Sequence, residues 1–367
     1  MKTEKLLYQI GISLIPMVGP KTARSLISYC GGVKEVFEAS KKELLRIPGI
    51  GEKTAESIRR QDVLQKAEHE ISFMEQHDIQ PLFYLDKLFP TRLKNVPDSP
   101  LLLFYKGSID LNAKRVVAIV GTRRPSMLGR RLCEELVEGL QPYDVVVISG
   151  LAFGIDITAH RKCVELGIPT LGALGHGLGL IYPNQHKQTA MQMIENGGLL
   201  SEYISNTAPE REHFPMRNRI IAGMCDALIV VETARRGGSM ISAYLANDYN
   251  RDVFALPGRP RDTQSHGCNH LIKSHKAALI DNMEDLAYAM NWEPPGQQKK
   301  VIQPQLFVEL SETEQAIADF LKPREEVGID ELTYALEMSS SQMAALLLNL
   351  EFKGVLRSLP GKRYAWL

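Results

Sequence analysis

Short apolar runs alternate with amphipathic stretches through the middle of the chain. Six of these runs, each followed by glycine or polar residues, are "RVVAIVGTR", "DVVVISGLAFGID", "GIPTLGALGHGL", "GGLLSEY", "CDALIVVETA" and "RDVFALPG". Strands that are apolar throughout and alternate with helices indicate a parallel sheet covered on both faces. We therefore predict an α/β fold, an extended Rossmann-like doubly wound sheet. The Pro-rich, extended stretch from Pro81 to Gly107 is expected to add an edge to this sheet.

The first 66 residues contain one short pattern twice. "IPMVGPKTARSLI" and "IPGIGEKTAESI" both place a glycine turn before Lys-Thr-Ala and a helical run. This layout is typical of a helix-hairpin-helix, or SAM-like, domain, in which turn amides and a lysine can hold a phosphate. The favoured interpretation is nevertheless a protein-contact or purely structural module. The candidate DNA contacts are Gly19, Lys21, Gly49, Gly51 and Lys53.

The composition of the chain changes after the predicted sheet. Residues 293–310 are polar and Pro-rich, as expected of a linker, and residues 311–367 predict three helices and a β-hairpin, a winged-helix-like domain. Asp330 and Ser339 to Ser341 are the expected helix caps. The expected second helix has almost no Arg or Lys, whereas a DNA-reading helix needs cations for phosphates. We therefore favour a protein-contact or structural role here. The predicted domains are 1–66, 67–292 and 311–367.

Composition narrows the classes of function. The 367 residues include 43 Lys plus Arg and 43 Asp plus Glu, so any anion site must be a local patch. The five cysteines are scattered without a CxxC pair, which favours free thiols over disulfides or zinc. No apolar run approaches the roughly 20 residues that cross a bilayer, and the N-terminus does not resemble a signal peptide. We expect a soluble, cytoplasmic protein with no membrane partner.

Candidate chemistry gathers after the strands, because ligands of open α/β sheets bind at the carboxyl ends of the strands. The turn from Gly121 to Arg123 suits a phosphate at a helix N-terminus, and Gly238 opens a second amide-rich turn. Phe214, among arginines, offers a flat face for a base, although it can equally be a core or lid aromatic. The predicted DNA-binding residues are Gly121, Thr122, Arg123, Lys187, Arg211, Phe214, Arg217, Asn218, Arg219, Gly238 and Ser239.

Structural roles compete for the Arg-Asn-Arg part of this set. Arg217 or Arg219 can form an internal ion pair with Asp226 or Glu232, because both carboxylates follow closely in the sequence. Asn218 can cap the following helix. The pattern therefore leaves two roles open for these residues, contact with an anion and support of the pocket.

An enzyme is the main competing class. Neither a GxGxxG fingerprint nor a P-loop occurs. Asp156 and His160 have an i, i+4 spacing that suits acid–base or metal chemistry. A helix cap and a packed histidine fit them better, because no third ligand or nucleophile is evident. Glu202 and Glu232 each follow a strand and are candidate bases without an obvious partner. We therefore expect no catalytic residue, no metal site and no cofactor.

Seven motifs occur in an order that strongly resembles the DNA-processing protein A family, DprA or Smf. They are "VAIVGTRRPSMLG", "VVISGLAFGIDITAH", "LGHGLGLIYPNQHK", "GLLSEY", "FPMRNRIIAG", "GGSMISA" and "VFALPG". The resemblance covers the doubly wound domain, and the flanking domains also occur in many members. The chain departs from the pattern with Gly-Gly-Ser at Ser239, where Ser-Gly-Ser or Ser-Gly-Thr is usual. It also has Ser-His-Lys where Gly-Ala is usual, which leaves a contribution of Lys273 or Lys276 open.

The resemblance implies a homodimer that binds single-stranded DNA, protects incoming DNA and loads RecA during natural transformation, without catalysis. Nothing in the sequence resembles a base-reading element, so little sequence preference is expected. One alternative is a nucleotide-processing enzyme of the lysine-decarboxylase-like phosphoribohydrolase type, which shares a related sheet and Gly loop. Another is an adaptor that contacts RecA but no DNA. The implied DNA contacts are Gly121, Thr122, Arg123, Arg211 and Phe214, with Arg217, Asn218 and Arg219 lining or bracing the pocket.

Overall fold

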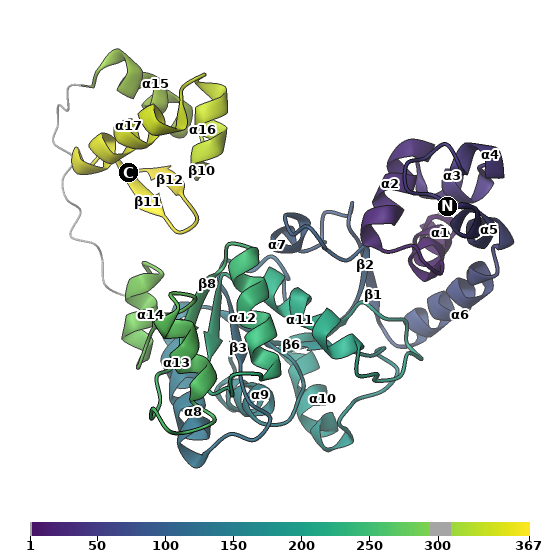
Figure 1. Ribbon diagram of the computed structural model, residues 1–367, viewed down its shortest axis with the longest axis horizontal. Helices are drawn as coiled ribbons and strands as arrows, with labels where there is room; N and C mark the ends of the chain where they lie inside the picture. Colours follow the sequence, from purple (N-terminus) through teal and green to yellow (C-terminus); the bar gives the residue numbers. More distant parts are fainter. Residues whose placement is uncertain (1, 294–309) are drawn as a thin grey trace. The chain divides into compact units, whose positions relative to one another are not determined.

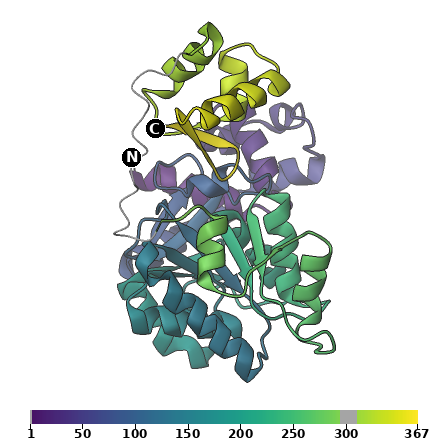
Figure 2. The ribbon, with the colours of Figure 1, turned by 90° about the vertical axis from the view of Figure 1, so that its left-hand side faces the viewer.

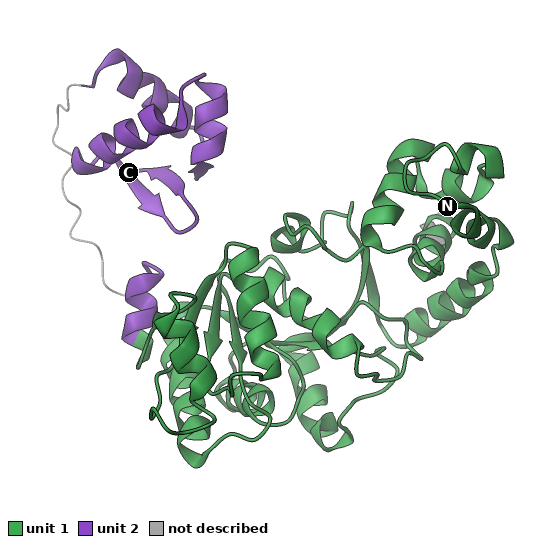
Figure 3. Ribbon diagram, in the orientation of Figure 1, with its two compact units in different colours: residues 1–283 green, residues 284–367 purple. Residues whose placement is uncertain are grey.

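The computed structural model describes residues 2–293 and 310–367, which belong to two compact units (Figure 3). The first unit runs from Met1 to Met283 and the second from Glu284 to Leu367. The expected linker, 293–310, lies outside the described residues except at its two ends. The three domain boundaries remain predictions, and the one at residue 66 falls inside helix α6 (Val63–Gln76).

A nine-stranded mixed sheet forms the centre of the first unit, in the order β1-β2-β6-β5-β4-β3-β7-β8-β9 (Figure 1). The sheet is parallel from β6 to β9, and β1 and β2 add an antiparallel edge. The six predicted strands and the added edge are confirmed; β9 has only two residues, too few to show a period. The strands are β1 (Gln80–Phe83), β2 (Leu102–Gly107), β3 (Val116–Val120), β4 (Val146–Ser149), β5 (Thr170–Leu174), β6 (Gly197–Ser201), β7 (Ala227–Val230), β8 (Asp252–Ala255) and β9 (Ala278–Leu279).

Helices cover both faces of this sheet, which explains why β3 to β7 are buried along their whole length. Helices α8, α9 and α10 pack on one another over one face, and α11 and α12 pack together over the other (Figures 1 and 2). The helices and turns of this part are α7 (Thr91–Lys94), α8 (Met127–Leu140), η1 (Gln141–Tyr143), α9 (Ile155–Leu166), η2 (Asn184–His186), α10 (Lys187–Glu195), α11 (His213–Met224), α12 (Gly238–Asp248) and α13 (His266–Lys273).

The order of the strands reverses at β3. The chain proceeds outward from β3 through β4 and β5 to β6, and then crosses back to place β7 on the other side of β3. The loops that follow β3 and β7 therefore leave in opposite directions, which opens a crevice at the carboxyl ends of these two strands. In a doubly wound sheet, a ligand is expected in this crevice.

Six helices precede the sheet and confirm the helix-hairpin-helix prediction. Helices α1 and α2 form one hairpin, and α4 and α5 form the other; Gly19 and Gly51 precede α2 and α5 in extended backbone. Gly49 has a φ of +85°, which favours glycine in the second turn. The helices are α1 (Lys2–Leu14), α2 (Pro20–Cys30), α3 (Val33–Glu38), α4 (Lys41–Leu44), α5 (Glu52–Arg60) and α6 (Val63–Gln76).

The first hairpin and α6 are attached to the sheet domain. Arg24 of α2 donates hydrogen bonds to the carbonyl oxygens of Ser99 and Pro100, at 3.1 and 3.3 Å. The buried Glu70 carboxylate of α6 accepts from the backbone N–H and the hydroxyl of Ser205, at 3.0 and 2.7 Å. One apolar core joins these helices to Ile204 beside β6. The N-terminal helices therefore cover the loop after β6.

The second unit confirms the winged-helix prediction. Three helices pack on a small sheet of order β10-β12-β11. Ser339 caps its helix by accepting from the N–H of Gln342, but Asp330 is not a cap, because β10 runs directly into the helix and Gly328 takes the cap position. Its elements are α14 (Met283–Ala289), α15 (Glu312–Leu321), β10 (Val327–Gly328), α16 (Ile329–Ala335), α17 (Ser340–Phe352), β11 (Leu356–Leu359) and β12 (Arg363–Trp366).

Candidate nucleic-acid interface

A cleft of about 570 Å³ lies at the carboxyl ends of the strands. Its walls come from the segments that follow β3, β4, β5, β6, β7 and β8, which lie far apart in the sequence. Nine of the eleven predicted DNA-binding residues line it, which leaves out Lys187 and Arg219. Lys187 is exposed at the start of α10 but lines no part of this cleft. The strand-end loops therefore do meet, although the predicted set is not one continuous surface.

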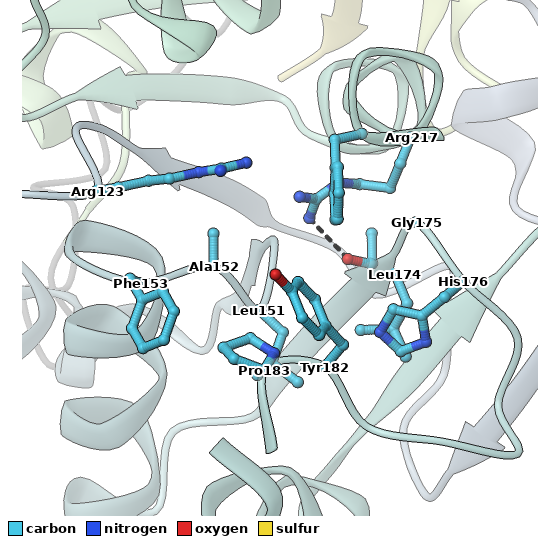
Figure 4. Close-up of a pocket in the computed structure, with 12 residues that line it drawn as sticks. Arg123, Leu151, Ala152, Phe153, Leu174, Gly175, His176, Tyr182, Pro183 and Arg217 are labelled. Carbon is cyan, nitrogen blue, oxygen red and sulfur yellow. Dashed lines mark hydrogen bonds between the residues drawn. The ribbon is translucent and has the colours of Figure 1, made fainter. Parts of the chain in front are cut away.

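A smaller recess adjoins the cleft, and we call it the aromatic recess. It is lined by Phe153, Tyr182 and Phe214, with Arg123 at its mouth (Figure 4). The ring centroids of Tyr182 and Phe214 are 6.2 Å apart, and the Arg123 guanidinium carbon lies 5.5 Å from the Phe214 ring centroid. Phe214 is half-buried and Tyr182 exposed. The sequence prediction missed Tyr182, although the loop "GLIYPNQH" presents an aromatic after a strand.

Arg123 and Arg211 are exposed cations that line this cleft. Both side chains are exposed, and neither forms an ion pair with a carboxylate in the described residues. Arg123 follows β3, and Arg211 precedes α11, so they stand on different walls. A guanidinium group can donate two parallel hydrogen bonds to a phosphate. The cleft therefore holds two exposed guanidinium groups, which are able to bind phosphate, together with the aromatic face of Phe214.

Arg217 supports the cleft from below. It is buried, and one Nη donates to the carbonyl oxygen of Ala173 on β5 at 2.7 Å (Figure 4). A Cβ at Gly150 would lie 1.9 Å from this group, so glycine at the end of β4 makes room for the guanidinium. Burial raises the pKa of Asp156, and the charge of Arg217 opposes that increase. Arg217 therefore contributes a fixed positive charge to the floor of the cleft.

Arg219 has a purely internal position. It is buried, forms an ion pair with Glu202 and donates to the carbonyl oxygen of Asp98. The predicted partners were wrong: Asp226 instead pairs with Arg92 at 2.7 Å, because α7 lies against the start of β3. Burial raises the pKa of Glu202, while Arg219 acts in the opposite direction. This ion pair engages one of the two candidate bases.

Glu232 occupies the N-terminus of α8. Its carboxylate accepts from the N–H and the hydroxyl of Ser126, at 2.8 and 2.5 Å, and Ser126 caps the helix. The carbonyl oxygen of Glu232 accepts from the Thr122 N–H at 2.6 Å. The Thr122 N–H and the N-terminus of α8 are therefore already engaged by Glu232, and the predicted phosphate contact of this turn stays a prediction that rests on Gly121, the Thr122 hydroxyl and Arg123. The second candidate base is engaged as well.

The start of α12 opens on the other side of the cleft. Gly238 is exposed, and a Cβ there would meet nothing within 4 Å, so a ligand can approach its backbone. The Ser239 hydroxyl is already used, because it donates to the Thr233 hydroxyl at 2.7 Å. Asn218 does not cap α12; its amide nitrogen lies 3.5 Å from the Gly238 carbonyl oxygen. Its position on α11 turns it toward that carbonyl and away from the N–H groups.

Asp156 and His160 form no catalytic pair. His160 is fully buried, and its ring nitrogens lie 2.7 Å from the Thr170 hydroxyl and 2.6 Å from the Gly150 carbonyl oxygen. Burial lowers the pKa of His160 to about 4. Gly154, with a φ of +83°, is the N-cap of α9, so Asp156 lies inside the first turn. The packed-histidine interpretation is confirmed, whereas the helix cap is Gly154, two residues before the predicted Asp156.

Other candidate chemistry is sparse in the described residues. No group of three His, Cys, Asp or Glu side chains in them is arranged to hold a metal ion. None of the helices in 2–293 and 310–367 is long and apolar enough to cross a membrane. All five cysteines are free thiols, four of them buried. In the hairpins, Lys21 and Lys53 are exposed, and Lys273 and Lys276 are exposed near the end of the sheet domain.

Three segments of the chain match families of known proteins. Residues 80–291 match DNA recombination-mediator protein A, residues 12–61 a SAM-like helix-hairpin-helix tandem, and residues 303–362 a DprA winged helix domain. Protein Smf of Synechocystis is 31% identical over 398 aligned residues, which cover 99% of each chain.

Two solved structures share the fold. DNA processing protein A of Streptococcus pneumoniae is similar with a TM-score of 0.64 at 32% identity, over 77% of this chain and 96% of that one. The protein of the same name from Helicobacter pylori has a TM-score of 0.53 at 29% identity, over 58% and 95%. That structure describes a single-stranded DNA binding mode.

Proposed function

This chain belongs to the DNA recombination-mediator protein A family, and on that basis we propose that it binds single-stranded DNA in the cleft between β3 and β7. The observation that carries the proposal is the placement of Arg123 against the half-buried Phe214, with Arg211 on the facing wall. The likeness to the Helicobacter pylori protein, whose structure concerns single-stranded DNA binding, supports it.

Binding follows from two additive contributions. Exposed Arg123 and Arg211 pair with phosphates, and the bound counterions of the strand are released. A base that enters the aromatic recess stacks on Phe214 and Tyr182, which contributes about 1–3 kcal/mol per base. Duplex DNA keeps its bases paired and stacked, so the recess selects for single strands. Because stacking accepts every base, sequence preference is slight.

The finer parts of the proposal concern the cell. We infer that the protein acts in the cytoplasm as a homodimer, protects incoming single strands and loads RecA on them during natural transformation, without a catalytic step. Family membership supports this role. The nucleotide-processing alternative is less well supported, because Glu202 is engaged by Arg219 and Glu232 by Ser126, and these were its two candidate bases. An adaptor that contacts RecA alone leaves the exposed Arg123 and Arg211 unexplained.

A fluorescence titration with a short oligothymidine at several salt concentrations tests the proposal. We expect Arg123→Ala to flatten the log–log salt slope by about 0.7, the value of one lost phosphate contact on a single strand. Phe214→Ala should weaken binding with the salt slope unchanged. Arg161→Ala, which removes an exposed charge from α9, is the control. Wild-type protein without measurable affinity, or both cleft variants binding normally, would contradict the proposed site.

A further inference from the structure

Four arginines outside the predicted site stand on the loops after β7 and β8. Arg235 and Arg236 follow β7, and Arg259 and Arg261 follow β8. All four side chains are exposed, and none pairs with a carboxylate in the part of the chain that the structure describes. On a chain with equal numbers of cations and anions, four unpaired guanidinium groups at one edge of the sheet form a local positive surface.

These two loops continue the wall of the cleft. Strands β7 and β8 are adjacent and parallel, so their carboxyl ends lie at the same edge as that of β3. The N–H of Gly267 donates to the carbonyl oxygen of Thr233 at 2.8 Å, which ties the second loop to the first. Gln264 of the second loop lines the cleft itself. The two arginine-bearing loops therefore adjoin the cleft at the carboxyl ends of β7 and β8.

The arginine loop after β8 is held in place. Asn269 of α13 donates to the carbonyl oxygen of Gly258 at 2.9 Å and accepts from its N–H at 3.1 Å. The ring of His266 lies 3.1 Å from the Pro260 carbonyl oxygen. These contacts hold Gly258 and Pro260, and the N–H of Asp262 donates to the Arg259 carbonyl oxygen at 3.0 Å, so less conformational entropy is lost when a phosphate binds there.

The junction between the cleft and these loops contains an unsatisfied acceptor. Oε1 of Gln264 is buried but has no hydrogen-bond partner among the described residues. Buried polar atoms are nearly always paired, so this acceptor keeps its hydrogen-bonding capacity for a donor that enters the cleft wall. An amino or imino group of a nucleobase is the donor that a strand in the cleft would bring to it.

The opposite end of the cleft is unsuitable for a continuing strand. Glu210 and Glu212 flank Arg211 there, and both are exposed. Beyond them, the loop after β6 is covered by the N-terminal helices through the contact between Ser205 and Glu70. At this end, glutamates repel phosphates and the N-terminal helices cover the loop. At the other end, exposed arginines attract phosphates, so a bound strand is expected to continue toward β8.

We propose that the bound single strand leaves the aromatic recess toward β8 and that its phosphates pair with Arg235, Arg236, Arg259 and Arg261. This inference rests on the proposed function and adds the path and length of the bound strand. A strand that only fills the recess does not reach these arginines, whereas a longer strand does. The site size of this chain therefore depends on two loops that the recess itself does not need.

Two double variants test the path, Arg235→Ala with Arg236→Ala and Arg259→Ala with Arg261→Ala. Each is titrated with oligothymidines of about 4 and about 16 nucleotides, the limits of common single-strand site sizes. With the long oligomer we expect weaker binding and a salt slope flatter by about 1.4, two phosphate contacts at about 0.7 each. With the short oligomer both quantities should stay at the wild-type values.

The control removes two exposed charges at other places of the same domain, with Lys114→Ala and Arg161→Ala together. Equal loss on both oligomers, or a control as weak as the variants, would overturn the path and indicate a general charge effect. Unchanged long-oligomer slopes in both variants would also overturn it. In that case, loss of binding in Phe214→Ala would still support the proposed function. Wild-type protein that binds neither oligomer would contradict the proposed function and the proposed path together.

Discussion

The inner face of helix α11 and the loops at the rim of the cleft use the same residue type for opposite purposes. Arg217 and Arg219 on α11 are buried, at 4% and 5% exposure, and are held by backbone carbonyls or Glu202. Arg123 and Arg211 on the rim are exposed and have no carboxylate partner in the described residues. Four arginines that look alike in sequence therefore divide into a buried, supporting pair and an exposed pair.

The difference follows from what surrounds each guanidinium group. A buried cation needs hydrogen bonds or an opposite charge to offset its desolvation, and once these are made it cannot turn toward a ligand. An exposed cation keeps its hydration and exchanges it for a phosphate when one arrives. Burial on α11 therefore gives Arg217 and Arg219 a structural role. We expect their substitution to lower the free energy of unfolding more than it lowers the affinity for single strands.

The largest expected effect is on the buried ion pair. Arg219→Met leaves Glu202 buried without its partner, which should lower the free energy of unfolding by about 3–5 kcal/mol. Urea unfolding measures the loss, and the added change Glu202→Gln should restore part of it. Arg123→Met, the exposed counterpart, should stay within about 0.5 kcal/mol. Equal losses for the two arginines would break the comparison.

The buried polar layer beneath the cleft should also make stability depend on pH. His160 has a pKa of about 4 in the folded protein, below its ordinary 6.5, so the unfolded chain binds the extra proton between these values. Lowering the pH from about 6.5 to about 4 should therefore reduce the free energy of unfolding by up to about 3 kcal/mol. Urea titrations across this range measure it. In the variant His160→Gln, the free energy of unfolding should depend less steeply on pH. If its pH dependence equals that of the wild type, other groups cause the effect.

The aromatic recess offers a further test that exposed residues of the cleft act in binding and contribute little to stability. Tyr182→Leu removes one of the two neighbouring rings of the recess, and it should weaken single-strand binding by about 1–3 kcal/mol. Because Tyr182 is 48% exposed, its loss should change the free energy of unfolding little. Parallel titration and urea unfolding separate the two quantities. Wild-type affinity in this variant would leave Phe214 as the sole platform.

The smallest expected effect on stability is at the rim arginine before α11. Arg211→Ala should leave the free energy of unfolding within about 0.5 kcal/mol of the wild type. It should flatten the single-strand salt slope by about 0.7, as one phosphate contact does. A stability loss comparable to that of Arg219→Met would place Arg211 in the framework instead.

The architecture followed from the sequence because its signals are local. Six continuous apolar runs separated by helical patterns predicted the strands, and two glycine turns before Lys-Thr-Ala predicted the hairpins. Strand-end loops of an open sheet must meet at one edge, so the cleft and nine of its residues were also predictable. A strand of two residues, such as β9, is too short to show an alternating pattern, so it could not be predicted from the sequence.

Only the tertiary structure decided which arginines are exposed and which are buried. Arg217 is buried because Gly150 makes room for it and Ala173, on another strand, accepts its hydrogen bond. Glu232 fills the N-terminus of α8 because β7 lies beside β3, although 106 positions separate it from Ser126. Exposure and pairing depend on such long-range neighbours, which no local pattern contains. The sequence alone therefore determined where the arginines gather, and the packing around each one determined its role.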